Sequence, residues 1–180
     1  MPHTLRTPRL ILRERTVRDA PKLHRAVGRY EVLKMTATWP WPASETYFRE
    51  RLAAAPTQAG AKRGFALVSA EDGSAPVVGD VGGGFSLDDG RFRIGYMLSP
   101  AWAGRGLATE ALRAVCRHFF RTVRLRMIWG ECYIDNPASA RVMLKAGFNY
   151  VGPAPPLWSA ARGRAVPGER FVLRRERYAG

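Results

Sequence analysis

The sequence predicts a single α/β domain of the α+β kind, with a mixed sheet flanked by helices. Its 180 residues, 46% of them hydrophobic, are enough to bury one substantial core. Short runs that alternate apolar and polar side chains, typical of half-buried strands, occur in both halves of the chain, and strongly helical segments lie among them. We therefore expect residues 1–180 to form one domain.

The first third of the chain is predicted to contain one strand and two helices. Residues 9–15 (RLILRER) alternate apolar and charged side chains, as a half-buried strand does. Asp19 is followed by apolar side chains at helical spacing, namely Leu23, Val27 and Tyr30. Ser44 follows two chain-breaking prolines and is typical of a helix N-cap, which predicts a second helix through Leu52.

Three consecutive strands are predicted in the middle of the chain. Residues 65–69 and 77–85 are apolar or β-branched runs, and a turn-prone EDGSAP segment separates them. Residues 91–98 alternate in the same way after an Asp-Asp-Gly turn. Strands joined by such short turns pair antiparallel, so we expect a meander.

The clearest helix in the sequence begins after Gly106. Its apolar side chains recur at helical spacing, and Arg113, Arg117 and Arg121 form a stripe on another face. This stripe either meets the phosphate of a ligand or faces water, and the sequence favours water.

The last third is predicted to continue as strand, helix and strand. Residues 127–134 form a buried-looking strand, residues 137–146 a short helix that ends at Gly147, and residues 148–151 a further strand. Residues 152–168 are rich in Pro, Ala and Gly, which predicts a mobile loop. The alternating segment ERFVLRRERY then predicts a final edge strand, where Phe171 offers a contact for a homodimer.

The charge balance is strongly basic. The chain has 29 Lys and Arg against 15 Asp and Glu, a formal net charge of +14, which attracts phosphate-bearing partners such as nucleic acid or phosphorylated cofactors. A merely solvated surface explains the excess equally well. The sequence lacks a helix-turn-helix, an RNP motif and a Lys/Arg cluster with interleaved aromatics, so nucleic-acid binding is disfavoured.

Other features narrow the class of protein further. Cys116 and Cys132 lie in apolar contexts without CxxC spacing and the histidines are scattered singly, so we expect neither a disulfide nor a bound metal. No apolar run approaches the roughly 18 residues of a membrane helix, and the first ten residues lack the apolar segment of a secretory signal. We therefore expect a cytoplasmic protein that does not contact a membrane.

The segment SPAWAGRGLATEAL, residues 99–112, predicts an anion site. Gly104 and Gly106 directly precede a helix, whose first N–H groups are free and whose dipole is positive at that end. Glycine lets the backbone approach a phosphate closely, and Arg105 adds a positive charge. A plain turn is an equally good explanation of the glycines, and the segment is neither a dinucleotide fingerprint nor a P-loop.

A second specific segment is NPASARVMLKAGF, residues 136–148. With this segment, TPRLILRERTVRDAPKL and IGYMLSPAWAGRGLATEAL, the chain resembles the GNAT superfamily of acetyl-CoA-dependent N-acetyltransferases. The resemblance is to the RimJ/RimL-like branch, which acetylates ribosomal-protein N-termini, and it covers nearly the whole chain. It implies the GNAT fold, a mostly antiparallel sheet of about seven strands with flanking helices and a splay between the fourth and fifth strands.

The resemblance also implies an activity. It implies direct transfer of the acetyl group from acetyl-CoA to a primary amine in a ternary complex, with a protein or peptide N-terminus favoured as the acceptor. A small-molecule amine acetyltransferase and a non-catalytic acyl-CoA-binding protein remain alternatives. The implied partners are acetyl-CoA and the amine, with no metal, and the chain is a monomer or a homodimer.

The coenzyme-binding residues follow from the same resemblance. The family writes its coenzyme loop [QR]xxGx[GA], and Ala103 here replaces the leading Gln or Arg. Many relatives have a tyrosine proton donor where this chain has Met143. The implied coenzyme-binding residues are Met97, Leu98, Ser99, Ala103, Gly104, Arg105, Gly106, Leu107, Ala108, Thr109, Asn136, Ser139 and Met143.

Two residues are implied to be catalytic. Ser139 is expected to donate a proton to the departing thiolate, and helix capping is the alternative. Glu131 is expected to act as the general base, directly or through water, and a salt bridge to an arginine is the alternative. The aromatic residues expected to form the acceptor wall, unless they serve core or dimer packing instead, are Trp39, Trp41 and Tyr47.

Overall fold

A computed structural model describes residues 4–54, 63–71 and 73–178 of the chain. Its strands are β1 (Thr4–Arg6), β2 (Leu10–Glu14), β3 (Arg63–Ser69), β4 (Val77–Phe85), β5 (Phe92–Leu98), β6 (Met127–Tyr133), β7 (Asn149–Ser159) and β8 (Arg164–Arg174). Its α-helices are α1 (Ala20–Val27), α2 (Tyr30–Leu33), α3 (Glu45–Ala53), α4 (Leu107–Thr122) and α5 (Pro137–Ala146). Short 3₁₀ helices are η1 (Val17–Asp19), η2 (Pro100–Trp102) and η3 (Arg175–Tyr178).

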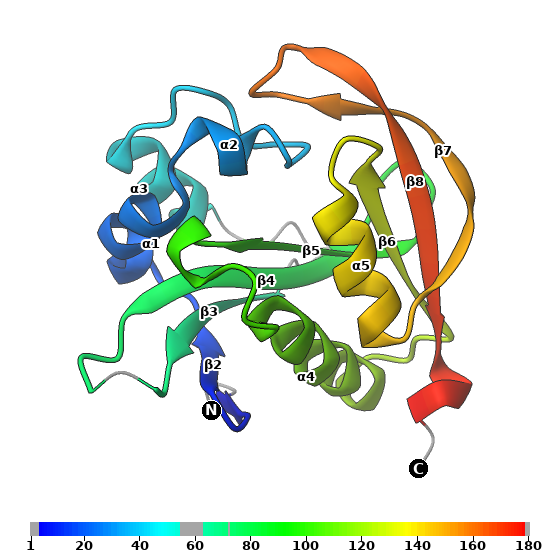
Figure 1. Ribbon diagram of the computed structural model, residues 1–180, viewed down its shortest axis with the longest axis horizontal. Coiled ribbons are helices and arrows are strands. Elements are labelled where there is room, and N and C mark those ends of the chain that lie inside the picture. The colour runs from blue at the N-terminus through cyan, green and yellow to red at the C-terminus, as the bar shows by residue number, and fades with distance from the viewer. Residues whose placement is uncertain (1–3, 55–62, 72, 179–180) are drawn as a thin grey trace.

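The strands form one sheet in the order β1-β2-β3-β4-β5-β6-β8-β7. Neighbouring strands run antiparallel except β5 and β6, which are parallel. Figure 1 shows α4 and α5 together over one face of the sheet, and α1 and α3 at the opposite side of the molecule. The predicted mixed, mostly antiparallel sheet with flanking helices is therefore confirmed.

The alternation of side chains along each strand divides the core in two. Phe65 and Leu67 of β3 point to the cluster that contains Phe119 of α4. Ala66 and Val68 point to the opposite cluster, with side chains of α1 and α3. Since both faces of the sheet are covered by helices, the middle strands are buried on both sides.

The predicted elements of the first two thirds are present, with two local differences. β3, β4 and β5 form the expected antiparallel meander, and the Ser44 side chain caps α3 by accepting from the Tyr47 N–H at 3.1 Å. The helix after Asp19 ends earlier than its spacing predicts, because Gly28 terminates α1, and Tyr30 begins the separate helix α2. The short strand β1 had no signal in the sequence.

The prediction of a mobile loop over residues 152–168 is wrong. These residues belong to a long hairpin in which β7 pairs antiparallel with β8, with register shifts between Tyr150 and Pro153 and between Ala154 and Leu157. β7 is the edge of the sheet, so a proline that lacks an N–H costs no ladder hydrogen bond on its outer side. The Pro-rich composition therefore marks an edge strand.

The ERFVLRRERY segment is likewise not an edge strand. Most of it lies in β8, which is flanked by β6 on one side and β7 on the other. The Phe171 side chain is consequently buried, with 1% of its surface exposed. Phe171 therefore has no exposed surface for the expected dimer contact, and the edge strands of the sheet are β1 and β7.

Three further observations concern the described part of the chain. None of its helices is long and apolar enough to cross a membrane. Within the same residues, no group of three His, Cys, Asp or Glu side chains is arranged to hold a metal ion. Cys116 and Cys132 are both free and buried, and burial raises the pKa of each thiol, that of Cys132 to about 11.

Candidate functional site

The strands β5 and β6 separate from each other soon after they meet. Their parallel pairing consists of one residue pair, Arg93 with Trp129. The Ser99 N–H donates to the Val78 carbonyl at 2.7 Å, and successive N–H groups of a strand point to opposite sides. The Leu98 N–H therefore points away from β4, into the gap between β5 and β6.

A glycine loop lies between the short helix η2, which follows β5, and the start of α4. Gly104 and Gly106 have φ angles of +78° and +79°, in the left-handed region that glycine adopts without strain. Gly106 is the N-cap residue of α4. The helical hydrogen bonds begin at Glu110, whose N–H donates to the Gly106 carbonyl at 3.1 Å. The preceding N–H groups of the first turn, at Leu107, Ala108 and Thr109, lack an intrahelical acceptor, an arrangement that is typical of anion sites in proteins.

An ion pair from the N-terminal part of the sheet fixes this loop. Arg9 Nη2 lies 2.7 Å from Glu110 Oε2, and Arg9 Nη1 donates to the Arg105 carbonyl at 2.7 Å. Burial by itself raises the pKa of Glu110, but hydrogen bonds from Thr7 and Arg9 hold that pKa below its usual range. The carboxylate thus stays charged at the N-terminus of α4, where the helix dipole favours it.

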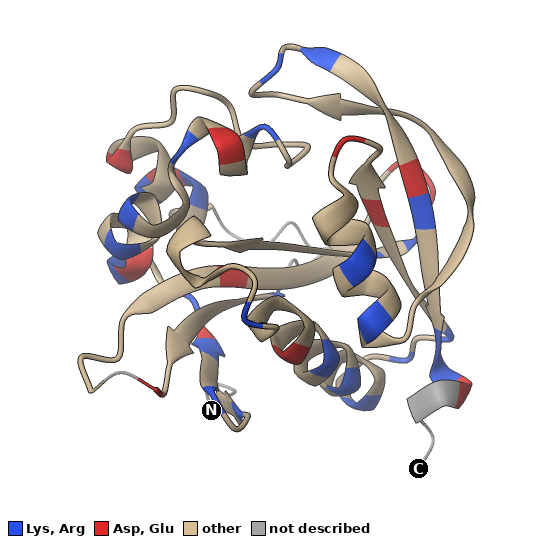
Figure 2. Ribbon diagram, in the orientation of Figure 1, with Lys and Arg blue, Asp and Glu red and all other residues tan. Residues whose placement is uncertain are grey.

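Next to the loop lies an open pocket of about 490 Å³ with a basic lining. Figure 2 shows Lys and Arg along the outward sides of α4 and α5, the two helices that border it. Arg113 of the predicted stripe lines the pocket and donates to the Lys145 carbonyl, and Arg117 also lines it, whereas Arg121 does not. The basic residues of the pocket are Arg6, Arg9, Arg113, Arg117 and Lys145.

The start of α5 faces the gap from the other side. The Asn136 side chain caps the helix by accepting from the Ser139 N–H at 3.2 Å, and Pro137 occupies the first turn. The Ser139 hydroxyl does not serve as the cap. Its oxygen lies 2.8 Å from the phenol oxygen of Tyr96, which comes from β5.

Met143 packs where α5 crosses β6. A Cβ atom at Gly130 would lie 2.7 Å from the Met143 sulfur, so a larger residue there would displace the Met143 side chain. The Met143 side chain is buried, with 2% of its surface exposed. Methionine cannot donate a proton. The hydroxyl groups that border the gap in this part of the described chain are those of Ser139 and Tyr96.

The remaining predicted coenzyme residues surround the gap and the loop. Met97 is buried toward the α1 and α3 cluster, Leu98 packs on the α4 cluster, and Ser99 is half-buried. Ala103 and Arg105 are exposed beside the glycines, and the Arg105 guanidinium stacks over the Trp102 ring at 4.9 Å. The side chains of Met97 and Leu98 thus lie on opposite faces of the sheet, and only their backbone borders the gap.

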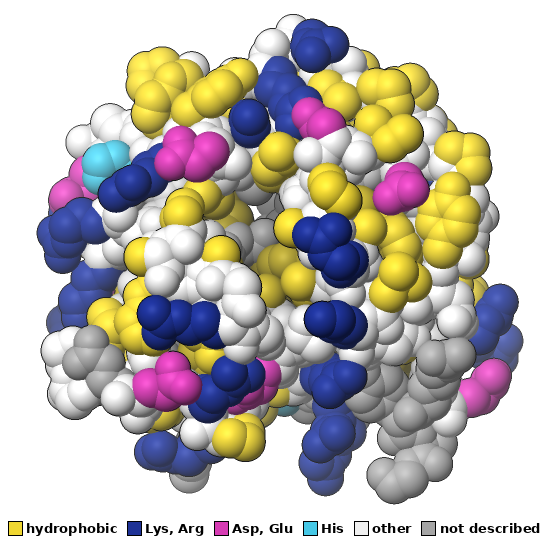
Figure 3. Space-filling model, viewed as in Figure 1, with side chains coloured by type: hydrophobic (Ala, Val, Ile, Leu, Met, Phe, Trp, Pro, Cys, Tyr) yellow, Lys and Arg dark blue, Asp and Glu magenta, His cyan; other side chains and the backbone are white. Residues whose placement is uncertain are grey.

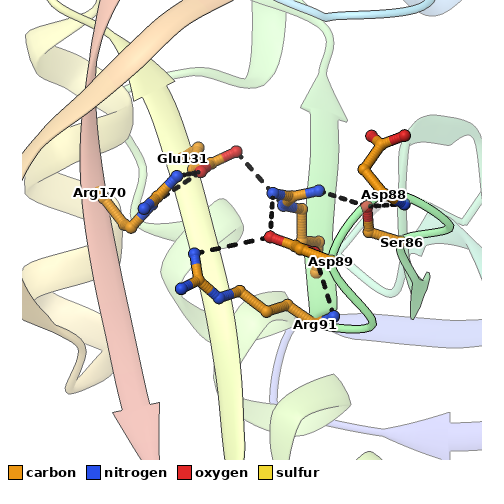
Figure 4. A network of polar contacts seen from close by, with 7 residues as sticks. Ser86, Asp88, Asp89, Arg91, Glu131 and Arg170 are labelled. Carbon is orange, nitrogen blue, oxygen red and sulfur yellow. Dashed lines mark hydrogen bonds and ion pairs between the residues drawn. The ribbon is translucent and has the colours of Figure 1, made fainter.

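Glu131 lies on the opposite face of β6 from Gly130 and is held by two arginines. Arg170 Nε donates to Glu131 Oε1 at 2.9 Å, and Arg93 Nε lies 3.4 Å from Oε2. Arg93 also pairs with Asp89 at 2.9 Å, which links the carboxylates in one network (Figure 4). The salt bridge weighed as an alternative role for Glu131 is therefore present.

The three predicted acceptor-wall aromatics lie in two environments. Trp39 is buried, with its ring 4.4 Å from that of Phe48 and 6.0 Å from that of Tyr47. Trp41 is 45% exposed, and its ring lies 5.9 Å from that of Tyr30. Of the three, Trp41 presents the most surface to a second molecule.

The tip of the β7–β8 hairpin is attached to the segment after α2. Arg162 Nε donates to the Lys34 carbonyl at 3.0 Å, its guanidinium forms two hydrogen bonds to Asp135 at 2.7 and 3.1 Å, and the Ala160 N–H donates to the Ala37 carbonyl. The Arg162 side chain is only 7% exposed and stacks over the Tyr133 ring at 4.9 Å. We call this set of contacts the hairpin bridge.

Figure 3 shows a hollow in the surface between the side of the molecule that holds α1 and α3 and the side that holds α5.

Arg162→Ala is expected to release the hairpin bridge and to lower the free energy of unfolding by about 2 kcal/mol, because several hydrogen bonds of a buried cation are lost. Urea denaturation measures this loss, and amide exchange at Ala160 reports the release directly. Arg164→Ala, an exposed change on the same hairpin, should stay within about 0.5 kcal/mol of the parent chain. Unchanged protection of the Ala160 amide would show that Arg162 does not hold the bridge.

Sequence reasoning did not find Tyr96, Arg9, Glu110 or Arg162. Tyr96 alternates with Ile94 and Leu98 and has the pattern of a core residue, while its partner Ser139 is 43 residues away. Arg9 and Glu110 are separated by 101 residues. No local signal marks such pairs, since each depends on how distant strands and helices meet.

Comparison with known proteins agrees with this geometry. The family model of the acetyltransferase (GNAT) domain matches residues 9–149. A ribosomal-protein-serine acetyltransferase of Escherichia coli (strain K12) is 38% identical over 55 residues, which are 31% of each chain. A probable N-acetyltransferase of Bacillus subtilis (strain 168) is 41% identical over 59 residues, 33% of each chain. The matches thus span about a third of the length of these curated relatives.

Solved structures match over almost the whole chain. A RimL ribosomal L7/L12 alpha-N-protein acetyltransferase in complex with coenzyme A superimposes with a TM-score of 0.78 at 19% identity, over 96% of this chain and 98% of that one. A GNAT-family acetyltransferase from Bacillus anthracis gives 0.77 at 20% identity, over 97% and 99%. At such identities the likeness establishes the fold. Together with the family match over residues 9–149, this shows that the chain belongs to the GNAT acetyltransferase family.

Proposed function

We propose that the protein is an acetyl-CoA-dependent N-acetyltransferase that transfers the acetyl group directly to a primary amine in a ternary complex. The observation that carries this proposal is the position of the anion cradle at residues 104–109, directly beside the gap between β5 and β6. A phosphorylated, extended ligand such as coenzyme A fits this combination. Its diphosphate suits the cradle, and its amide-containing arm suits the unpaired edge of β5.

The coenzyme in this proposal runs along the backbone of residues 97–99 and past Asn136. The adenosine 3′-phosphate lies toward the basic pocket, where Arg117 and Lys145 supply positive charge. The Leu98 N–H, which points into the gap, polarises the thioester carbonyl and stabilises the negative charge that develops on its oxygen. Such a donor contributes about 3 kcal/mol in other acyl-transfer sites.

Acetyl transfer also requires a proton for the leaving sulfur and the loss of a proton from the amine. Ser139 is assigned the first role, because its hydroxyl borders the gap and is not used as a helix cap. Glu131 is assigned a role on the amine side of β6. Both of its oxygens already face arginines, which favours a relay through water or the orientation of the incoming ammonium over direct removal of the proton.

A protein or peptide N-terminus is the proposed acceptor. The support comes from the curated relative named for acetylation of a ribosomal-protein serine and from the similar structure named for ribosomal L7/L12. The proposed entry lies on the side of the gap that holds Trp41 and the hairpin bridge. An exposed aromatic ring there offers contact area to an extended peptide.

Acetyl-CoA at about 100 times its dissociation constant is expected to stabilise the chain by about 2.7 kcal/mol, because the coenzyme binds the folded state alone. A thermal melt should then move upward by about 5–10 °C, since each kcal/mol shifts the melting temperature of a chain of this length by about 2–4 °C. A melt that does not move at any coenzyme concentration would overturn the proposal. A thiol-release assay over a panel of peptides and small amines then separates an enzyme from a protein that binds acyl-CoA without turnover.

A further inference from the structure

Three polar side chains from three elements meet at the gap between β5 and β6. The Tyr96 phenol oxygen of β5 lies 2.8 Å from the Ser139 hydroxyl oxygen and 3.3 Å from the Ser139 carbonyl oxygen of α5. The Ser139 side chain also interacts with the Cys132 thiol of β6, since it partly offsets the rise that burial causes in the pKa of that thiol. The neighbours of Tyr96 on the same strand face, Ile94 and Leu98, are apolar and pack on the α4 core.

The next question is which acceptors the hydroxyl protons of Tyr96 and Ser139 point to. Burial raises the pKa of Tyr96, so the phenol keeps its proton at neutral pH and is able to donate it. Ser139 has a single hydroxyl proton. If that proton points at the Cys132 sulfur, the phenol donates its own proton to Ser139, whose hydroxyl oxygen at 2.8 Å is a nearer acceptor than its carbonyl oxygen at 3.3 Å. In this arrangement the Ser139 proton is directed at sulfur and away from Tyr96.

We propose that Tyr96 is a positioning residue that holds Ser139 with its hydroxyl proton toward the coenzyme sulfur. The inference rests on the proposed binding of acetyl-CoA in the gap. A thiolate formed on acetyl transfer is a stronger acceptor than the neutral Cys132 thiol, so the Ser139 proton turns to it. The Tyr96 hydrogen bond polarises the Ser139 hydroxyl and makes it a better donor, as hydrogen bonds in a chain do.

The test compares coenzyme A with acetyl-CoA, because only the free coenzyme has a sulfur that can ionise. At pH 8.5, Tyr96→Phe is expected to weaken the binding of coenzyme A about tenfold and to change the affinity for acetyl-CoA less than twofold, by isothermal calorimetry. The variant keeps the aromatic ring that fills the site. In the parent chain, coenzyme A should also gain affinity relative to acetyl-CoA as the pH rises from 6 to 9, and Tyr96→Phe should flatten this gain.

A mutant cycle separates positioning from an independent effect. Ser139→Ala should reproduce the loss, and Tyr96→Phe in the Ser139→Ala background should add nothing to it. Tyr150→Phe removes the same hydroxyl from a half-exposed tyrosine on β7 and should leave both affinities unchanged. Two results would overturn the positioning role alone. One is a double variant whose loss of coenzyme A affinity is the product of the two single losses, and the other is a Tyr96→Phe chain whose coenzyme A affinity changes with pH as in the parent chain. Absence of any acetyl-CoA binding by the parent chain would overturn the proposed function, and this inference with it.

Discussion

Gly106→Val is expected to weaken acetyl-CoA binding by about a thousandfold, or about 4 kcal/mol, because several charge-assisted hydrogen bonds to the diphosphate are lost together. Gly106 has a φ of +79°, which a β-branched residue adopts only with strain. The valine therefore moves the backbone at the start of α4, where the free N–H groups converge. Equilibrium binding measured by calorimetry gives the change in affinity.

Gly90→Val is the matched control for this loss. Gly90 has a φ of +66° in the turn between β4 and β5, and a Cβ there meets nothing within 4 Å. Both substitutions strain the backbone and should lower the melting temperature, but Gly90→Val should keep the parent affinity for acetyl-CoA. An unaltered affinity in Gly106→Val would remove residues 104–109 from the coenzyme site.

Asp19→Asn is expected to lower the free energy of unfolding by about 3 kcal/mol, because it breaks a buried, hydrogen-bonded ion pair. Asp19 Oδ1 and Oδ2 accept from the Arg13 guanidinium at 2.6 and 2.8 Å, and Oδ2 also accepts from the Thr16 N–H at 2.8 Å. The Asp19 side chain is 3% exposed. It connects the end of β2 to the start of α1, so both elements depend on it.

The same pair predicts a dependence of stability on pH. Burial alone raises the pKa of Asp19, but the hydrogen bonds from Arg13 and Thr16 outweigh it and hold the pKa below its usual range. A carboxyl with a lowered folded pKa stabilises the protein above its unfolded pKa of about 4, and that stabilisation is lost as the pH falls toward the folded value. The stability difference between parent and Asp19→Asn should therefore be full at pH 7 and shrink below pH 4.

Denaturant unfolding at pH 7 and at pH 3 measures both effects. Glu45→Gln removes one partner of the exposed Glu45–Arg49 pair, whose side chains are 44% and 52% exposed, and should cost less than about 0.5 kcal/mol at either pH. A loss in Asp19→Asn no larger than that of Glu45→Gln would contradict the assigned role of the buried pair.

Local chemistry made much of the fold predictable. Ser44 capped the helix expected after it, and Gly147 ended the helix expected before it, because caps act within a few residues. The meander of β3, β4 and β5 followed from short turns between alternating runs. The hairpin of β7 and β8 could not be predicted, since the prolines of an edge strand and those of a loop look alike until the partner strand is known.

The sequence by itself determined the helices α3, α4 and α5, the meander, the glycine loop before α4 and the Asn-Pro start of α5, because each is specified by residues that lie close together in the chain. The tertiary structure alone decided which distant side chains contact one another. These contacts are Tyr96 with Ser139, Glu131 with Arg93 and Arg170, and those of Arg162 in the hairpin bridge. These contacts join residues from tens to more than a hundred positions apart. They arise only when strands and helices pack to bury apolar surface, a requirement that belongs to the whole chain.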